Sequence, residues 1–272
     1  IGKFLSAEGD MISNEGIAKN LYDLYDSLAG HELVHSGRTG GFEFVRHEGF
    51  AWPNMAYRPG RSGPARREEI RLLKELMVSE GWPKLVLFDE EGMTGEVQEL
   101  LAKERLIGAT EWVNMALPVG KSAGHGRWES ENVGKMGNLE CRRIDVDDPG
   151  EWSQWASVVS GVLFKNTPLD PGLFRHPAIK QQFSLMTAYV DGKAVATCLL
   201  YFGESAGLYM VATLPEFQGK GFGRQLMGYS RAEAAARGYE FVVLHSTKAG
   251  LNFYSGLGFK SFGKLFLYYS MQ

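Results

Sequence analysis

The chain contains 272 residues, of which 44% are hydrophobic and 22% are charged, and its net charge is −3. This composition is that of a soluble globular protein with enough apolar residues for one large domain or two smaller ones. The weak negative charge argues against nucleic acid or an anionic membrane as a partner, and the sequence has no run of 18 apolar residues that could span a bilayer.

Hydrophobic periodicity predicts an α/β arrangement in residues 40–118. A helix with Ile17, Leu21 and Leu24 on one face precedes it, and the glycines that follow end this helix. The run 85–88 is uninterrupted by polar residues, as in a buried strand. In chain order we expect a helix at 13–28, strands at 42–47 and 52–57, a helix at 65–79, a strand at 85–88, a helix at 94–106 and a strand at 112–117.

The polar, glycine-rich stretch at 119–138 shows no periodicity, and we expect it to be a linker. A second α/β pattern follows, in which the pair Asp191-Gly192 predicts a hairpin turn. For this half we expect strands at 140–146, 185–190, 194–202, 207–213, 241–245 and 264–269, and helices at 150–163, 171–181, 221–237 and 250–256.

The two cysteines, Cys141 and Cys198, lie in predicted strands and form no CxxC pair. Two thiols cannot make a metal site alone, so no metal is expected. We expect both to be reduced residues of a cytoplasmic protein, because disulfides are rare in that compartment. The first residues also lack the apolar core of a signal peptide.

The most informative segment is a predicted strand–loop–helix junction at residues 208–224. The strand leads through Leu214-Pro215-Glu216-Phe217 into Gln218-Gly219-Lys220-Gly221-Phe222-Gly223, and a helix begins directly afterwards. Glycines at alternate positions let the backbone approach a bulky anion. The first N–H groups of the helix then point at that anion with the positive end of the helix dipole. The sequence therefore predicts a pyrophosphate site here.

Two other phosphate-binding loops are disfavoured. A Walker loop requires GxxxxGK followed by Ser or Thr, and the sequence contains no such string. A GxGxxG dinucleotide fingerprint that starts at Gly219 would need a glycine where Arg224 stands. The junction also follows several predicted antiparallel strands, whereas a Rossmann fold opens with it.

The junction resembles the Q/R-x-x-G-x-G/A signature of the GNAT superfamily of N-acetyltransferases, with Gln218, Gly221 and Gly223 at its fixed positions. Downstream, the segment Asn252-Phe253-Tyr254-Ser255-Gly256-Leu257-Gly258-Phe259 resembles the family's F/L-Y-x-x-L-G-F motif. The resemblance covers residues 140–270. It implies the GNAT acyl-CoA N-acyltransferase fold, an α/β (α+β) fold with a mixed, largely antiparallel twisted sheet flanked by helices.

The resemblance also implies where acetyl-CoA, the co-substrate, binds. The strand end at Val211, Ala212 and Thr213 corresponds to a β-bulge whose backbone N–H groups bond the pantetheine arm and the thioester carbonyl. Thr247 and Asn252 lie on the flank that contacts CoA, and Thr247 departs from the Asn that many members have there. The residues implied to hold the pyrophosphate are Gln218, Gly219, Lys220, Gly221, Phe222, Gly223 and Arg224.

Tyr254 corresponds to the general acid that protonates the departing thiolate. A phenol with a pKa of about 10 is reasonably matched to a thiol with a pKa of about 8.5. The amine must lose a proton to a base or to a water relay, and the strand before the loop lacks the Glu found in some relatives. Candidate bases are Glu204, Glu216 and His245, and the base stays open.

Residues 40–118 resemble a degenerate second GNAT-like unit in their element order alone, as in tandem members of the superfamily. The predicted organisation is therefore an N-terminal α/β domain at 1–118, a linker at 119–138 and a GNAT domain at 139–272. We expect the N-terminal half to shape the acceptor pocket or to mediate formation of a homodimer.

The resemblance implies an enzyme that transfers acetyl from acetyl-CoA to an amine by direct attack in a ternary complex. The acceptor is a small-molecule or peptide amine that the sequence leaves open, because variable loops and helices recognise it. Two alternatives stay open. One is a non-catalytic acyl-CoA-binding module that regulates or scaffolds, and the other is transfer of a longer acyl group or transfer to a hydroxyl.

Overall fold

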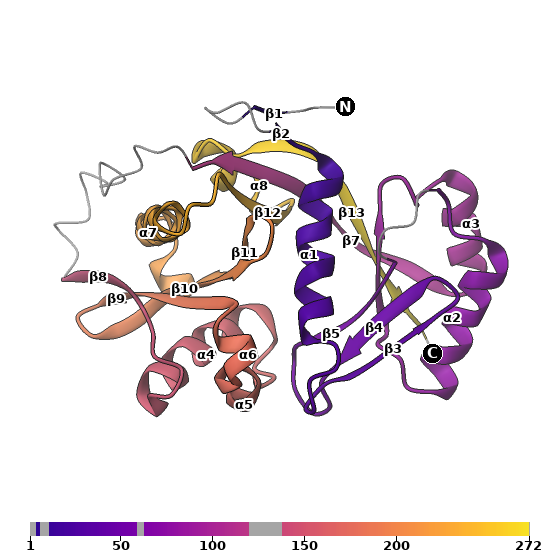
Figure 1. Ribbon diagram of the computed structural model, residues 1–272, viewed down its shortest axis with the longest axis horizontal. Helices are drawn as coiled ribbons and strands as arrows, with labels where there is room; N and C mark the ends of the chain where they lie inside the picture. The colour runs from indigo at the N-terminus through magenta and orange to yellow at the C-terminus, as the bar shows by residue number, and fades with distance from the viewer. Residues whose placement is uncertain (1–3, 6–10, 59–62, 120–137, 272) are drawn as a thin grey trace. The chain divides into compact units, whose positions relative to one another are not determined.

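The computed structural model describes residues 4–5, 11–58, 63–119 and 138–271 (Figure 1). Contacts divide the chain into two compact units. Unit 1 consists of Ile1–Lys3, Ile12–Met115 and His245–Gln272, and unit 2 of Phe4–Met11 and Ala116–Leu244. Most of the predicted linker lies outside the described residues. None of the helices in the described part of the chain has the length and apolar character that crossing a membrane requires.

Unit 1 is a mixed sheet with helices packed on it. The strands β1 (Phe4–Leu5) and β2 (Met11–Ile12) come first in the chain. The sheet of unit 1 has the order β3-β4-β5-β6-β13-β7, in which β5 and β6 are parallel and β6 and β13 antiparallel. Its elements are α1 (Asn14–Leu28), β3 (His35–Thr39), β4 (Phe42–Arg46), β5 (Asn54–Tyr57), α2 (Arg67–Ser79), β6 (Leu85–Asp89), α3 (Gly95–Lys103), most of β7 (Leu106–Pro118), α8 (Leu251–Gly256) and β13 (Lys260–Ser270).

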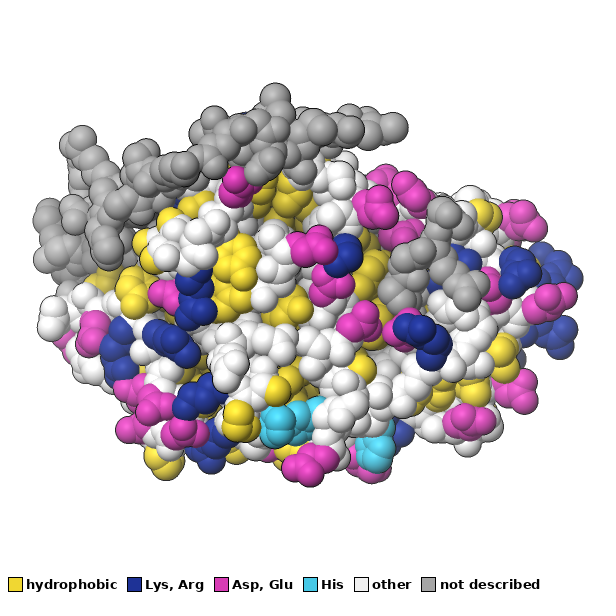
Figure 2. All heavy atoms as spheres, in the orientation of Figure 1, with side chains coloured by type: hydrophobic (Ala, Val, Ile, Leu, Met, Phe, Trp, Pro, Cys, Tyr) yellow, Lys and Arg dark blue, Asp and Glu magenta, His cyan; other side chains and the backbone are white. Residues whose placement is uncertain are grey.

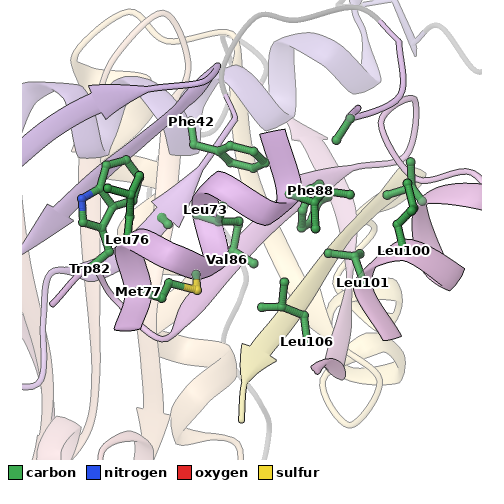
Figure 3. Close-up of a cluster of buried hydrophobic side chains, with 14 residues drawn as sticks. Phe42, Leu73, Leu76, Met77, Trp82, Val86, Phe88, Leu100, Leu101 and Leu106 are labelled. Carbon is green, nitrogen blue, oxygen red and sulfur yellow. The ribbon is translucent and has the colours of Figure 1, made fainter. Parts of the chain in front are cut away.

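Apolar side chains from helices and strands together form the core of unit 1. Ser13 begins α1, since its side chain accepts a hydrogen bond from the Gly16 N–H at 3.0 Å. On the other face of the strands, buried side chains of α2 and α3 pack against β4 and β6 (Figure 3). The ring of Phe88 makes an edge contact with the ring of Phe42, with centroids 5.7 Å apart. This cluster supplies the apolar burial that stabilises unit 1.

Several elements of unit 1 differ from the prediction, most clearly β3, α3 and β7. Strand β3 was not predicted because its sequence is polar and contains Gly37. The glycine is needed there, since a Cβ atom would lie 2.7 Å from Cε1 of Phe44 on the paired strand. Helix α3 ends at Lys103 instead of 106, and β7 begins at Leu106 instead of 112, because Arg105 turns the chain with φ of 57°.

Unit 2 has the strand order β12-β11-β10-β9-β8. The pair β11–β12 is parallel, and the other pairs are antiparallel, so the predicted mixed and largely antiparallel sheet is confirmed. The elements are β8 (Leu139–Arg143), α4 (Pro149–Leu163), α5 (Pro171–Arg175), α6 (Pro177–Lys180), β9 (Phe183–Val190), β10 (Lys193–Phe202), β11 (Ala206–Thr213), a 3₁₀ turn (Pro215–Phe217), α7 (Phe222–Ala236) and most of β12 (Phe241–Thr247). One helix was predicted at 171–181, but the structure has two, α5 and α6. They are separate because Pro177 keeps His176 before it extended.

Helices cover both faces of the unit 2 sheet, with α7 on one side and α4, α5 and α6 on the other (Figure 1). On the α7 side, the Ser230 hydroxyl lies 3.1 Å from the Cys198 thiol and 3.3 Å from the Met186 sulfur. On the α4 side, the Trp155 indole donates a hydrogen bond of 3.3 Å to the Cys198 carbonyl. Consecutive residues of β9 and β10 therefore face different helices.

One element order occurs twice along the chain. The series β3-β4-β5-α2-β6-α3-β7 corresponds to β9-β10-β11-α7-β12-α8-β13, including the parallel pair around the first helix. The sequence predicted residues 139–272 as one domain, whereas the contacts group residues 245–272 with unit 1. The reason is that β13 pairs with β6, with Leu267 opposite Leu87.

We predict that Phe88→Ala lowers the free energy of unfolding by about 3–5 kcal/mol, because the ring is 1% exposed and its removal leaves a cavity. Val78 of α2 is 68% exposed, so Val78→Ala should change stability by less than about 0.5 kcal/mol. Urea denaturation of both variants measures the difference. Equal effects would contradict the described packing of β6 under α2 and α3.

Candidate active site

Strand β11 contains a bulge next to its end. Thr197 and Leu199 of β10 are two residues apart, while their partners Ala212 and Tyr209 are three apart, so β11 has one extra residue. The bulge includes Met210, whose φ is 49°. This left-handed conformation costs about 1–2 kcal/mol for a residue other than glycine. The bulge predicted at this strand end is confirmed.

The parallel pairing of β11 with β12 is short. Ala206–Leu208 lie opposite Val242–Leu244 of β12, and β11 itself continues to Thr213. On its other side, β11 remains paired beyond the bulge, with Ala212 and Thr213 opposite Thr197 and Ala196 of β10. The residues predicted to bond pantetheine, Val211–Thr213, are the last three of β11.

The glycine loop leads from β11 into α7 through two left-handed residues. Gly219 has φ of 73° and Gly221 has φ of 89°, and Gly221 is the residue at which α7 begins. The side-chain amide of Gln218 donates a hydrogen bond of 3.0 Å to the Thr213 carbonyl, which ties the loop to the end of β11. Phe222 is buried, so its ring fixes the first turn of the helix.

The N-terminus of α7 has the properties of an anion site. No side chain caps it, and its first turn carries no acidic residue. The exposed Lys220 and the half-buried Arg224 add positive charge at the same place. Unpaired N–H groups at a helix start bind phosphate oxygens, so the predicted pyrophosphate residues form one continuous surface within unit 2.

The corresponding helix of unit 1 is closed by its own side chains. Glu69 of α2 accepts a hydrogen bond of 2.9 Å from the backbone N–H of Arg66, and Glu68 places a second carboxylate in the first turn. Glu69 also pairs with Arg58 and Arg66, so its carboxylate is engaged within unit 1. The start of α7, which has no carboxylate and no side-chain cap, thus suits an anion better than the start of α2.

The remaining predicted residues lie in unit 1, on the end of β12 and on α8. Thr247 is exposed, and its carbonyl accepts a hydrogen bond of 3.0 Å from the N–H of Gly250. Asn252 is exposed in the first turn of α8. The Tyr254 ring packs edge-on against Phe259 with centroids 5.7 Å apart, and Gly250 leaves room for it, since a Cβ atom there would lie 3.0 Å from the ring.

His245 takes part in a partly buried polar network of unit 1. Its Nδ1 lies 2.7 Å from Oδ1 of Asn114, and Nδ2 of Asn114 donates a 2.7 Å hydrogen bond to Asn14. Gly263 leaves space for the Asn14 side chain. Burial lowers the pKa of His245 to about 3, so the imidazole is neutral near pH 7 and is a weak proton acceptor. These values argue against the predicted role of His245 as the base.

Of the two carboxylate candidates for the base, Glu204 lies far from the bulge and Glu216 is exposed to solvent. Glu204 is exposed in the turn before β11, and seven extended residues of about 3.3 Å each separate it from Val211, a span of roughly 20 Å. This distance argues against Glu204 as the base. Glu216 is exposed and lies 3.4 Å from Nζ of Lys193. No group of three or more His, Cys, Asp or Glu residues in the described chain is arranged to hold a metal ion.

Comparison with known proteins identifies a family for the region that contains β11, the glycine loop and α7. The family model of the acetyltransferase (GNAT) domain matches residues 181–261. This segment is a GNAT domain. The match begins just before β9, includes the glycine loop and ends at the start of β13, so it contains both predicted motifs. A GNAT domain transfers acyl groups, and acyl transfer is the chemistry that this segment supports. None of the curated proteins matches the chain in sequence.

Solved structures extend the GNAT likeness to nearly the whole chain. A GCN5-related N-acetyltransferase from Kribbella flavida superposes with a TM-score of 0.67 at 13% identity, covering 96% of this chain and 97% of its own. One from Sphaerobacter thermophilus gives a TM-score of 0.59 at 13% identity, covering 91% and 84%. A conserved Staphylococcus epidermidis protein of unknown function gives 0.61 at 11% identity, covering 85% and 91%. At these identities the likeness concerns the fold, which includes both units.

Sequence reasoning missed the residue that forms the bulge and the partner of His245. Methionine is not a residue that signals a left-handed conformation, so nothing at position 210 pointed to the extra residue. Asn114 is fully buried in β7, and a polar residue at such a position in a predicted strand was the available signal.

We predict that His245 makes the protein less stable as the pH falls. Its pKa is about 3 in the folded chain and about 6.5 in an unfolded one, so between these values only the unfolded chain binds the proton. Stability should fall from pH 6.5 downwards by up to about 1.4 kcal/mol per pH unit. Urea midpoints at pH 7 and pH 5 should therefore differ less in His245→Gln than in the wild type.

The matched control is His35→Gln, since His35 is exposed in β3 of the same unit. This variant should keep the pH dependence of the wild type. A His245→Gln protein with an unchanged pH dependence would show that the imidazole is not buried in its neutral form.

Proposed function

We propose that the protein transfers the acetyl group of acetyl-CoA to an amine by direct attack in a ternary complex. The observation that carries this proposal is the sequence of features along β11 and α7. A bulged strand leads, through a left-handed glycine loop, to a helix start without a side-chain cap. Such a surface suits acetyl-CoA, with its thioester at the strand and its diphosphate at the helix start.

The residues of unit 2 have distinct roles in this proposal. Backbone amides of Gln218–Arg224 bind the pyrophosphate of acetyl-CoA. Amides of Val211–Thr213 bind the pantetheine arm and the thioester oxygen, where negative charge develops as the amine attacks. Bound acetyl-CoA supplies an activated acyl group on sulfur. Because these donors are fixed by the bulge before the reaction begins, they need no reorganisation to stabilise that charge.

Tyr254 is proposed to donate a proton to the sulfur as the carbon–sulfur bond breaks. Its ring is held from two sides by Phe253 and Phe259, at centroid distances of 5.1 and 5.7 Å. A held phenol can present its hydroxyl in one direction, which general acid catalysis requires. Thr247 and Asn252, exposed on β12 and α8, are proposed to contact CoA.

The acceptor is proposed to be a small molecule or a peptide amine. On the face that Figure 2 shows, basic and acidic side chains are intermixed rather than gathered by sign. Such a surface suits neither nucleic acid nor another polyanion as the principal partner. The cysteines Cys141 and Cys198 are both free thiols, which supports a reducing cytoplasmic location.

We expect Gly221→Ala to weaken acetyl-CoA binding about tenfold or more. Gly221 has φ of 89°, so an alanine there is strained by about 1–2 kcal/mol and turns the first N–H groups of α7 away. Gly192→Ala is the matched control, because Gly192 has φ of 82° in the β9–β10 turn and open space around its Cβ position. Titration calorimetry should give one site per chain, a weaker Kd for Gly221→Ala and an unchanged Kd for Gly192→Ala. Absence of any CoA binding to the wild type would refute the proposed function.

We expect Tyr254→Phe to lower kcat about 100-fold and to leave the Kd of acetyl-CoA unchanged, since only the proton donor is lost. The assay measures CoA release over a panel of amines, with the half-exposed Tyr269→Phe as a control of unchanged activity. Tight acetyl-CoA binding without turnover of any amine would favour the non-catalytic module. Turnover of longer acyl-CoAs or of alcohols in the same assay would favour the third alternative.

A further inference from the structure

Two lysines lie against one aromatic ring beside the glycine loop of unit 2. The Nζ atom of Lys193 lies 5.2 Å from the centre of the Phe217 ring, and Nζ of Lys220 lies 5.5 Å from the same centre. At such distances the negative face of an aromatic ring attracts an ammonium group. The ring therefore brings together two positive charges that come from different parts of the chain.

The backbone at both lysines is fixed by its own contacts. Lys193 is the first residue of β10 and follows Gly192, whose φ is 82° in the β9–β10 turn. The N–H of Leu214 donates a hydrogen bond of 3.0 Å to the Val195 carbonyl, which ties the segment after β11 to the start of β10. Lys220 belongs to the glycine loop itself. Only the two exposed side chains therefore have to be ordered when a ligand binds.

The Phe217 ring is anchored to the start of α7. It is half-buried, and its centre lies 5.8 Å from that of the Phe222 ring, which is 1% exposed in the first turn of the helix. The N–H of Phe217 donates a hydrogen bond of 2.9 Å to the Leu214 carbonyl, which closes the 3₁₀ turn. The ring consequently holds both ammonium groups next to the residues that the proposed function assigns to the pyrophosphate.

The cluster around this ring carries a net positive charge. The Glu216 carboxylate lies 3.4 Å from Nζ of Lys193. The pKa of the Glu216 carboxyl is lowered, first because its own backbone N–H donates a hydrogen bond to it, and then because Lys193 and Lys220 are close. Arg224 adds a third cation in the first turn of α7. The three cations outnumber this carboxylate, so the cluster attracts anions.

Acetyl-CoA carries a further phosphate besides its diphosphate. This group is a monoester on the 3′-hydroxyl of the adenosine ribose, and phosphate monoesters have a charge of about −2 near pH 7. In the proposed complex the diphosphate binds to residues 218–224, and the ribose is attached directly to it. The 3′-phosphate must therefore lie beside the same loop, where lysine side chains can bind it as point charges on flexible stems.

We propose that the Lys193 and Lys220 side chains bind the 3′-phosphate of acetyl-CoA, so that the protein distinguishes acetyl-CoA from its 3′-dephospho form. This inference rests on the proposed function. It adds a specificity residue from the β9–β10 turn, which lies outside both motifs of the GNAT resemblance. Glu216, a predicted candidate base, has a different role in this assignment, since its carboxylate orients Lys193.

The test compares the Kd of acetyl-CoA with that of acetyl-3′-dephospho-CoA, which keeps the diphosphate, the pantetheine and the thioester. We expect calorimetry to give a wild-type preference of about tenfold or more for acetyl-CoA, because two charge-assisted contacts are lost with the 3′-phosphate. Raising the salt concentration from about 0.05 M to about 0.5 M should reduce this preference, since exposed charges are screened.

Substitution of each lysine should act on one ligand only. We expect Lys193→Gln and Lys220→Gln each to reduce the preference to about threefold, and the double variant to abolish it. The Kd of acetyl-3′-dephospho-CoA should stay within about twofold of the wild-type value in all three, because that ligand has no group for these side chains to bind. Lys193→Arg keeps the charge and should keep the preference.

Lys165→Gln is the matched control, because Lys165 is an exposed lysine of unit 2 that follows α4, on the other side of the sheet from α7 (Figure 1). It should keep the wild-type preference. A wild type that binds both ligands equally, or lysine variants that keep the preference, would overturn this inference and leave the proposed function standing. Variants that weaken both ligands equally would overturn it by showing that the lysines act on the diphosphate or on the loop. A wild type that binds neither ligand would overturn the proposed function, and this inference with it.

Discussion

A mismatch of one residue between β10 and β11 is the constraint on which the candidate site depends. The sheet accommodates the extra residue by turning Met210 into a left-handed conformation, and the parallel pairing of β11 with β12 has already ended at Leu208. Val211–Thr213 therefore form the strand end directly after the bulge and before the loop that leads to α7. Pairing and burial of β11 between β10 and β12 stabilise the strand enough to offset the conformational strain at Met210.

The two units show how one element order can serve different purposes. Each has a parallel strand pair joined by a helix, but the starts of the two helices differ chemically. The start of α7 has glycines and no carboxylate, while the start of α2 has Glu68 and Glu69, and Glu69 accepts a hydrogen bond from the Arg66 N–H. Local sequence, and not the element order, thus makes the two helix starts chemically different.

The sheets of both units also contain polar side chains in their interior. His245 lies in a network with Asn114 and Asn14 that stabilises a neutral imidazole. Thr197 and Thr187 are fully buried and lie directly opposite each other on β10 and β9. Burying a polar group costs free energy unless it is hydrogen-bonded, so such groups are retained where they take part in a network or in the chemistry.

The sequence alone determined the features that depend on neighbours along the chain. Helix α1 follows from Ser13 and its apolar face, the left-handed start of α7 follows from the glycine spacing, and the two motifs identified the GNAT region. The tertiary structure decided what depends on distant partners. Strand β3 forms because Phe44 needs the space at Gly37, residues 245–272 join unit 1 because β13 pairs with β6, and Glu204 lies far from the bulge because β11 is extended. Capping and turn propensities act over a few residues and can be read locally, whereas strand pairing, burial and the resulting pKa of His245 arise only when segments far apart in the sequence meet.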